Sequence, residues 1–191
     1  AAFLRGTILS SERKYEEANQ EFRVVVEQYP QSEFAPEAMY KMGECLAQLN
    51  RMDEAANVFA TFATTYPSHA LVQEAILRVG DAKFLGAKFS DAIAEYKRVL
   101  ETAPDPVKEE LTLYRLAVSY HNMQDFKSSA NTFRTLLDKY PQTAHRAEAH
   151  VRIGFYLLGD GKDPVRAIES FQAAQQVDAK GPFAGRAMLG L

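Results

Sequence analysis

The amino-acid sequence predicts an all-α solenoid, in which helical hairpins stack side by side along the chain. Apolar residues within each segment follow the i, i+3, i+4, i+7 spacing of an amphipathic helix. Several sequence features also recur every 37 residues, which is the mark of a repeat architecture. One recurring column is proline, at Pro30, Pro67, Pro104 and Pro141. A second column, which we call the small column, holds Gly6, Gly43, Gly80, Ala117 and Gly154.

The period divides the 191 residues into five helical-hairpin repeats and the start of a sixth, in a single array. The approximate bounds are 1–30, 31–67, 68–104, 105–141, 142–181 and a partial repeat 182–191. The fifth repeat shifts by one residue after an enlarged turn at 159–164, so that Ala167 and Phe171 take the equivalent positions. Gly190 indicates a sixth repeat, and the apolar end 183–191 predicts a fragment of a longer array.

The second repeat shows how each unit is built. Its first helix carries Met39, Met42, Gly43 and Leu46, and its second carries Ala55, Val58, Phe59 and Phe62. Short polar turns at 50–53, 87–90 and 123–125 are typical of antiparallel helix pairs. Proline ends the second helix, and a capping residue follows, as at Ser32, Ser68 or Thr143. We expect the two helices to cross at the small column, with the column of Ala18, Ala55 and Ala92 facing it.

Composition and charge exclude several classes of function. The chain has 22 Lys and Arg against 25 Asp and Glu, a net charge of −3, which disfavours nucleic-acid binding. No stretch reaches the roughly 18 apolar residues of a membrane span, so we expect no direct membrane insertion in this segment. Cys45 is the single cysteine, and His145 and His150 are five residues apart, a poor spacing for ligands on one helix. We therefore predict no metal, no cofactor and no catalytic residues.

These residues resemble the tetratricopeptide repeat pattern of L-G-x₂-Y, then A-x₃-F, then P. The second repeat has Met42-Gly43, then Ala55 and Phe59, then Pro67, and the likeness covers essentially the whole chain. It implies a right-handed α-α superhelix. Two positions depart from the pattern, because Lys83 stands where Leu46 is expected and Ser129 replaces the Ala of its column.

The segment between the first two repeats is also similar to the repeats of bacterial cell-envelope proteins of this family. Its residues are Tyr29, Pro30, Ser32, Ala35 and Ala38. The examples are the β-barrel assembly lipoprotein and the Tol-Pal-associated cell-division coordinator. This likeness implies a periplasmic or cell-envelope location, with the cytoplasm as the alternative.

In this family the first helices line a concave groove, so matched positions form ladders along it. The columns around the small residue predict a groove that binds a partner helix or extended peptide, with an apolar stripe, a basic row and a third mixed column. The predicted partner-binding residues are Tyr40, Lys41, Glu44, Leu77, Arg78, Asp81, Tyr114, Arg115, Val118, Val151, Arg152 and Phe155. The alternative is that Glu37-Lys41, Glu74-Arg78 and Glu148-Arg152 are i, i+4 pairs that support a solvated helix.

The predicted function is a non-catalytic protein-protein interaction scaffold, within a bacterial cell-envelope assembly. The clamp for chaperone C-termini is disfavoured, because its Lys and Asn columns hold neither residue. One alternative is a regulatory or substrate-docking region of a larger enzyme. Another is self-association through the C-terminal apolar end, which includes Met188, Leu189 and Leu191.

Overall fold

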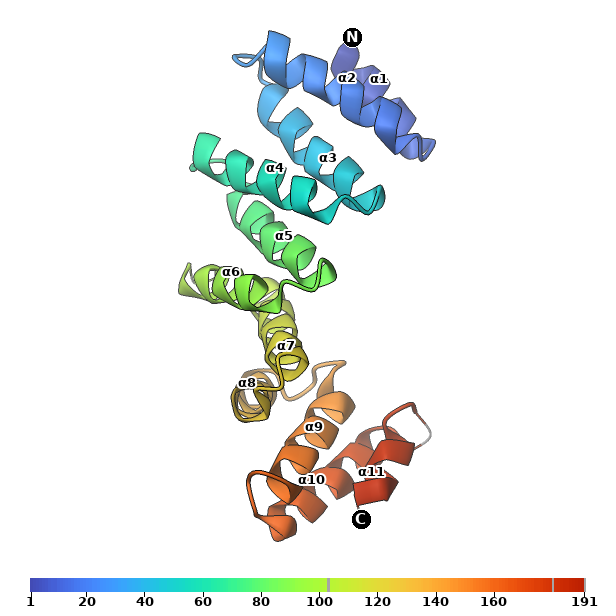
Figure 1. The fold of residues 1–191 in the computed structure, drawn as a ribbon, viewed down its shortest axis with the longest axis vertical. Coiled ribbons are helices and arrows are strands. Elements are labelled where there is room, and N and C mark those ends of the chain that lie inside the picture. The colour runs from blue at the N-terminus through green and yellow to red at the C-terminus, as the bar shows by residue number, and fades with distance from the viewer. Residues whose placement is uncertain (103, 180, 191) are drawn as a thin grey trace. The chain divides into compact units, whose positions relative to one another are not determined.

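The computed structural model describes residues 1–102, 104–179 and 181–190, which form eleven α-helices and no strand (Figure 1). Two predictions lie partly outside the described residues, because they include Ala103 before Pro104 and Leu191 of the apolar end. Contacts divide the chain into two compact units, residues 1–102 and 103–191.

The first unit holds three helical hairpins, in which each helix packs against the next along the chain. Its helices are α1 (Ala2–Ser11), α2 (Tyr15–Gln28), α3 (Ala35–Gln48), α4 (Met52–Thr65), α5 (Val72–Leu85) and α6 (Phe89–Glu101). The second unit holds two hairpins and one further helix, which contacts both α9 and α10. Its helices are α7 (Pro106–Asn122), α8 (Phe126–Lys139), α9 (Arg146–Leu158), α10 (Pro164–Val177) and α11 (Ala184–Gly190). The predicted all-α fold of five hairpins and a sixth first helix is confirmed.

The glycine column marks close approach within the hairpins, where the ring of an aromatic residue on the second helix lies against each glycine. A Cβ built on Gly43 would lie 2.6 Å from a ring carbon of Phe59, and the same holds for Gly80 with Tyr96. Gly6 with Phe22 and Gly154 with Phe171 repeat this arrangement. The ring fills the space that the absent side chain leaves. Ala18, Ala55 and Ala92, which we expected beside the glycines, are fully buried in the same core.

The fourth repeat differs at this position because it carries Ala117 in place of glycine. Ala117 and Phe133 are both fully buried, so this hairpin accommodates the extra methyl group. The hydroxyl of Ser129 donates a hydrogen bond of 2.9 Å to the carbonyl oxygen of Ala117. The departure at Ser129 is thus satisfied within the core. The other departure, Lys83, pairs with Glu95 of the same hairpin at 2.9 Å.

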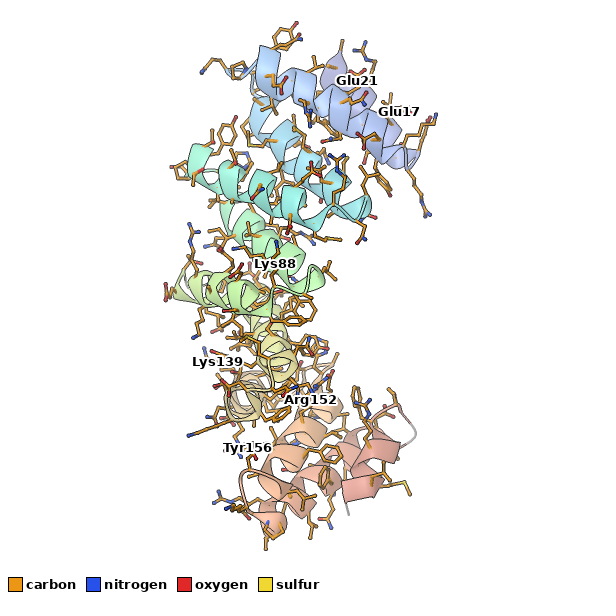
Figure 2. All side chains as sticks on the ribbon, viewed as in Figure 1. Glu17, Glu21, Lys88, Lys139, Arg152 and Tyr156 are labelled. Carbon is orange, nitrogen blue, oxygen red and sulfur yellow. The ribbon has the colours of Figure 1, made fainter. Side chains whose placement is uncertain are left out.

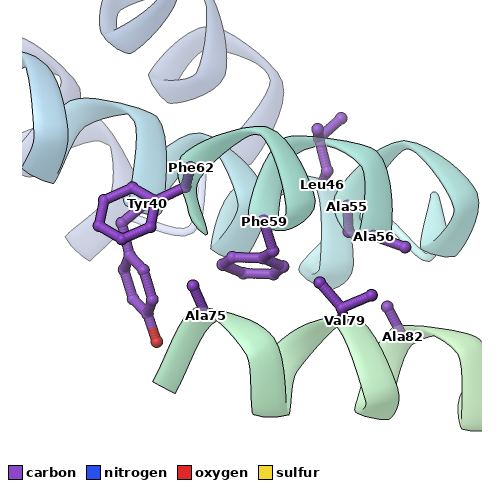
Figure 3. Close-up of a cluster of buried hydrophobic side chains, with 9 residues drawn as sticks. All are labelled: Tyr40, Leu46, Ala55, Ala56, Phe59, Phe62, Ala75, Val79 and Ala82. Atoms are coloured by element: carbon purple, nitrogen blue, oxygen red, sulfur yellow. The ribbon is translucent and has the colours of Figure 1, made fainter. Parts of the chain in front are cut away.

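Adjacent hairpins share one core, which a cluster on α3, α4 and α5 illustrates (Figure 3). Phe59 and Phe62 of α4 lie between Tyr40 of α3 and Ala75 and Val79 of α5. All five side chains are buried. Because α5 belongs to the next repeat, each hairpin buries apolar surface that it cannot bury alone.

The turns follow a column pattern that the sequence analysis did not identify. Each hairpin turn contains one non-glycine residue with a left-handed backbone. These residues are Arg13, Asn50, Ala87, Gln124 and Lys162, with φ of 62°, 61°, 58°, 62° and 48°. Between repeats, the oxygen of Ser32 accepts from the N–H of Phe34, and Thr143 accepts equivalently from His145. In the second connection this acceptor is Nδ1 of His69, not the predicted Ser68, because His69 stands 37 residues after Ser32.

Gly190 also has a role other than the predicted one. The glycines of the small column contact the aromatic ring of the helix that follows them. Gly190 instead packs against the ring of Phe171, in the helix that precedes it. The register is set by fully buried small residues spaced 37 apart, such as Ala38 and Ala75, and Ala187 continues this column after the one-residue shift. Gly190 is therefore not equivalent to the glycines of the small column.

Candidate functional site: an aromatic and arginine-lined pocket on α9

The predicted apolar stripe is mostly part of the core. Tyr40, Leu77 and Val151 are 7%, 2% and 2% exposed, so the prediction that they form an open stripe is wrong. The physical reason is the hairpin geometry. The Tyr40 side chain packs against the second helix of its hairpin, where its ring centroid lies 5.3 Å from that of Phe59. Tyr114 of the same column is partly buried.

In the first unit, the hydroxyl of Tyr40 lies within a polar cluster on α5. Nε of Arg78 donates to the Tyr40 hydroxyl oxygen at 3.4 Å and pairs with Glu74 at 3.1 Å. Arg78 also lies 3.9 Å from Asp81, which accepts a hydrogen bond from the Tyr96 hydroxyl at 3.0 Å. Burial is the main cause that raises the pKa of Tyr40, so the phenol is protonated at neutral pH. The predicted residues of α5 are therefore engaged with each other.

The second unit repeats the arrangement with residues 74 positions further along. The Tyr114 hydroxyl donates to Glu148 at 3.0 Å, and Glu148 pairs with Arg152 at 2.6 Å. Burial, together with the negative charge of Glu148, raises the pKa of Tyr114 to about 12. The imidazole of His145 stacks on the Tyr114 ring with centroids 3.5 Å apart. In both units a tyrosine of one repeat binds the Glu-Arg pair of the next repeat.

These contacts distinguish between the two interpretations of the basic row. The i, i+4 pairing occurs at Glu74-Arg78 and at Glu148-Arg152. Glu37 and Lys41, which both lie in the described part of the chain, form no ion pair. The remaining predicted residues are partly buried on their first helices, at Lys41, Glu44, Arg115 and Val118. Phe155 differs from the others, because 43% of it is exposed.

Phe155 and Arg152 line a cavity of about 570 Å³ in the second unit, which we call the α9 pocket. The remaining lining residues belong to α7, α8, α9, the turn after α9, and α11. They are His121, Phe126, Ser129, Tyr156, Gly159, Asp160, Arg186 and Leu189. Arg152 and Tyr156 are labelled on α9 in Figure 2. Because residues three and four apart share one helix face, Arg152, Phe155 and Tyr156 line the pocket together.

The aromatic walls of the α9 pocket are held in place by neighbouring rings. Phe155 meets Phe171 edge-on at 5.1 Å between centroids, and Phe126 meets His121 at 5.2 Å. Arg152 is only 18% exposed and its guanidinium carbon lies 6.0 Å from the centroid of the Phe133 ring. Burial lowers the pKa of His121, and the positive charges of Arg152 and Arg186 lower it further. The pocket thus combines preformed apolar walls with positive charge.

Sequence reasoning found Arg152 and Phe155 but missed His121, Phe126, Tyr156, Arg186 and Leu189. The helix period alone places Tyr156 beside Arg152, so that signal was present. The positions of the α7, α8 and α11 residues around the pocket depend on packing between helices. Residue spacing within one helix does not predict that packing. Among the described residues, no group of three His, Cys, Asp or Glu could hold a metal ion. No helix in the described ranges has the length and apolar character needed to span a bilayer.

A family model described as YfiO, outer membrane lipoprotein, matches residues 11–157, which is well over half of the chain. The chain belongs to this family. No curated protein matches the chain significantly. The fold likeness extends to solved tetratricopeptide repeat structures, and at this level of identity it concerns the fold alone.

One similar structure is MamA 41-end from Desulfovibrio magneticus RS-1, with a TM-score of 0.73 and 19% identity over 95% of each chain. Another is YrrB, whose title describes a TPR protein with an unusual peptide-binding site. It has a TM-score of 0.74 and 15% identity, and the match covers 98% of this chain and 90% of that one. A tetratricopeptide repeat protein from Parabacteroides merdae ATCC 43184 has a TM-score of 0.68 and 18% identity, over 81% of this chain and 57% of that chain. The tetratricopeptide repeat fold predicted from the sequence is confirmed.

Proposed function

We propose that the chain is a non-catalytic binding module that takes up a short segment of a partner protein in the α9 pocket. The observation that carries this proposal is the pocket itself, whose apolar walls are exposed and yet fixed by neighbouring side chains. Phe155 is 43% exposed and Phe126 is 37% exposed. Exposed aromatic side chains in a concave site are typical of binding surfaces, because their burial against a partner is favourable.

The polar clusters around Tyr40 and Tyr114 have a different role in this proposal. Their side chains hold consecutive first helices together, so they keep the repeats in register and position α9. The groove residues Arg78 and Arg152 therefore act mainly through their pairs with Glu74 and Glu148. Because these arginines are engaged in ion pairs, we restrict the binding surface to the α9 pocket of the second unit, where aromatic side chains are exposed.

We also propose that this binding takes place at the bacterial cell envelope. The support is the family description, which names an outer membrane lipoprotein. Fractionation of the native cells, followed by protease treatment of intact cells and of permeabilised cells, tests this part. We expect the chain to be recovered with the envelope fraction and to be protected from protease until the outer membrane is permeabilised. Recovery of the chain with the soluble cytoplasmic proteins would contradict it.

Site-specific crosslinking tests the binding function directly. Benzoylphenylalanine at position 155 retains an aromatic side chain and places a photoreactive group in the α9 pocket. We expect adducts with one recurring polypeptide, with crosslinked residues confined to one short segment of it. The matched control is the same group at Val165, which is 66% exposed on α10 outside the pocket. Equal yields at the two positions, or adducts scattered over many proteins, would refute the proposal.

A further inference from the structure

The lining of the α9 pocket indicates which partner chemistry it accepts. We propose that it binds a segment in which a bulky apolar side chain stands beside carboxylates, as in Phe or Leu next to Glu or Asp. This inference rests on the proposed function, because it specifies the ligand of the same pocket. It is argued from the size of the pocket, its walls and its charge.

Size determines how much of a partner enters. The volume of about 570 Å³ is within the usual range of ligand pockets and is too small to enclose a whole helix. A partner can therefore place one or two side chains inside while its backbone runs along the rim. Such anchor residues typically carry most of the binding energy of an interface.

The apolar walls favour a large apolar anchor. Phe155 and Phe126 are 43% and 37% exposed, so each gains from burial against a ligand. The edge contact of Phe155 with Phe171 fixes the ring before a ligand arrives. An aromatic or long aliphatic side chain can then pack against a surface that does not need to reorganise.

Charge favours carboxylates beside that anchor. The lining carries two guanidinium groups, Arg152 and Arg186, against one carboxylate, Asp160. Arg152 is already paired with Glu148. Arg186 is exposed on α11, and within residues 104–179 and 181–190 no carboxylate forms an ion pair with it. An incoming carboxylate can therefore bind Arg186 without breaking an existing pair, and bidentate geometry suits it.

The effect of both arginines on His121 supports this account. Their positive charges lower the pKa of the imidazole in addition to the larger effect of burial. His121 is consequently neutral at physiological pH, and it adds no positive charge of its own. A basic segment would meet the like charge of Arg186, which is unfavourable.

Selection from a phage-displayed library of random peptides on the intact chain tests the inference without knowledge of the natural partner. We expect the enriched peptides to share an aromatic, Leu or Met residue next to Asp or Glu. Fluorescence anisotropy of the most enriched peptide then gives its Kd. Replacement of its acids by Gln should weaken binding about tenfold, and replacement by Lys should weaken it further.

Two charge reversals in the chain assign the effect to the pocket. Arg186→Glu should weaken the acidic peptide about tenfold or more, whereas Lys127→Glu, an exposed reversal on α8 outside the pocket, should leave Kd unchanged. Circular dichroism confirms that both variants stay folded. If no peptide is enriched, the proposed function and this inference both fail. If peptides bind without an acidic preference, or bind Arg186→Glu as tightly as the original chain, only this inference is overturned.

Discussion

The contact between Gly43 and Phe59 offers the sharpest test of the repeat packing. In Gly43→Ala the added methyl would lie 2.6 Å from Cε1 of Phe59, well inside van der Waals contact. The ring is 1% exposed and has Tyr40 against its edge at 5.3 Å, so it has little room to move. Overpacking of this kind costs about 1 to 3 kcal/mol. Alanine recovers about 1 kcal/mol of helix propensity, which leaves a net loss of about 1 kcal/mol.

Urea denaturation followed by circular dichroism measures this loss in the transition of the first unit. The matched control is Gly185→Ala on α11, where an added Cβ meets nothing within 4 Å. That variant should gain up to about 1 kcal/mol from helix propensity alone. The two substitutions are chemically identical, so their opposite signs isolate the ring contact. An equal or higher stability of Gly43→Ala, relative to the original chain, would refute the packing described for the glycine column.

Three further predictions concern single residues. Ala87→Gly should raise the free energy of unfolding by about 0.5 to 1 kcal/mol, because φ is 58° at this turn, and an unchanged urea midpoint would contradict this. Asn19→Leu keeps the number of side-chain heavy atoms and removes the buried Asn19 Oδ1, which has no donor among the described residues, so it should raise the free energy of unfolding by about 1 kcal/mol in thermal denaturation, and a destabilised variant would contradict this. The third prediction is pH-dependent. The pKa of Tyr114 is raised from 10.0 to about 12, so its stabilising contribution is complete below pH 10 and is lost as the pH rises toward 12. Tyr114→Phe should flatten the fall in stability over that range, and an unaltered slope would show that the pKa of Tyr114 is not raised in the folded chain.

The fold was predictable because the same residue pattern recurs in each repeat. The proline spacing, the glycine column and the aromatic residues at Phe22 and Phe59 share one period, and a period is visible without knowledge of any contact. What the period could not specify is that the ring of Phe59 fills the space beside Gly43, because this contact depends on side-chain direction across two helices.

The candidate site was predictable only in part, for a related reason. A ladder of matched positions does not report burial, and therefore Tyr40 and Leu77 were assigned to a surface although they are core residues. Arg152 and Phe155, which the same ladder included, line the α9 pocket. Arg186 breaks the pattern, since it stands where the earlier repeats have Glu74 and Glu148. Such a single departure from a column has no periodic signal.

Binding of a partner segment in the α9 pocket can be observed residue by residue in an amide chemical-shift titration of the isotope-labelled chain with the most enriched acidic peptide. We expect saturable shifts at residues 152–160 and 186–189, while the amides of the first unit, residues 1–102, stay unchanged. Saturable shifts confined to the first unit, or to α8 residues outside the pocket, would contradict it.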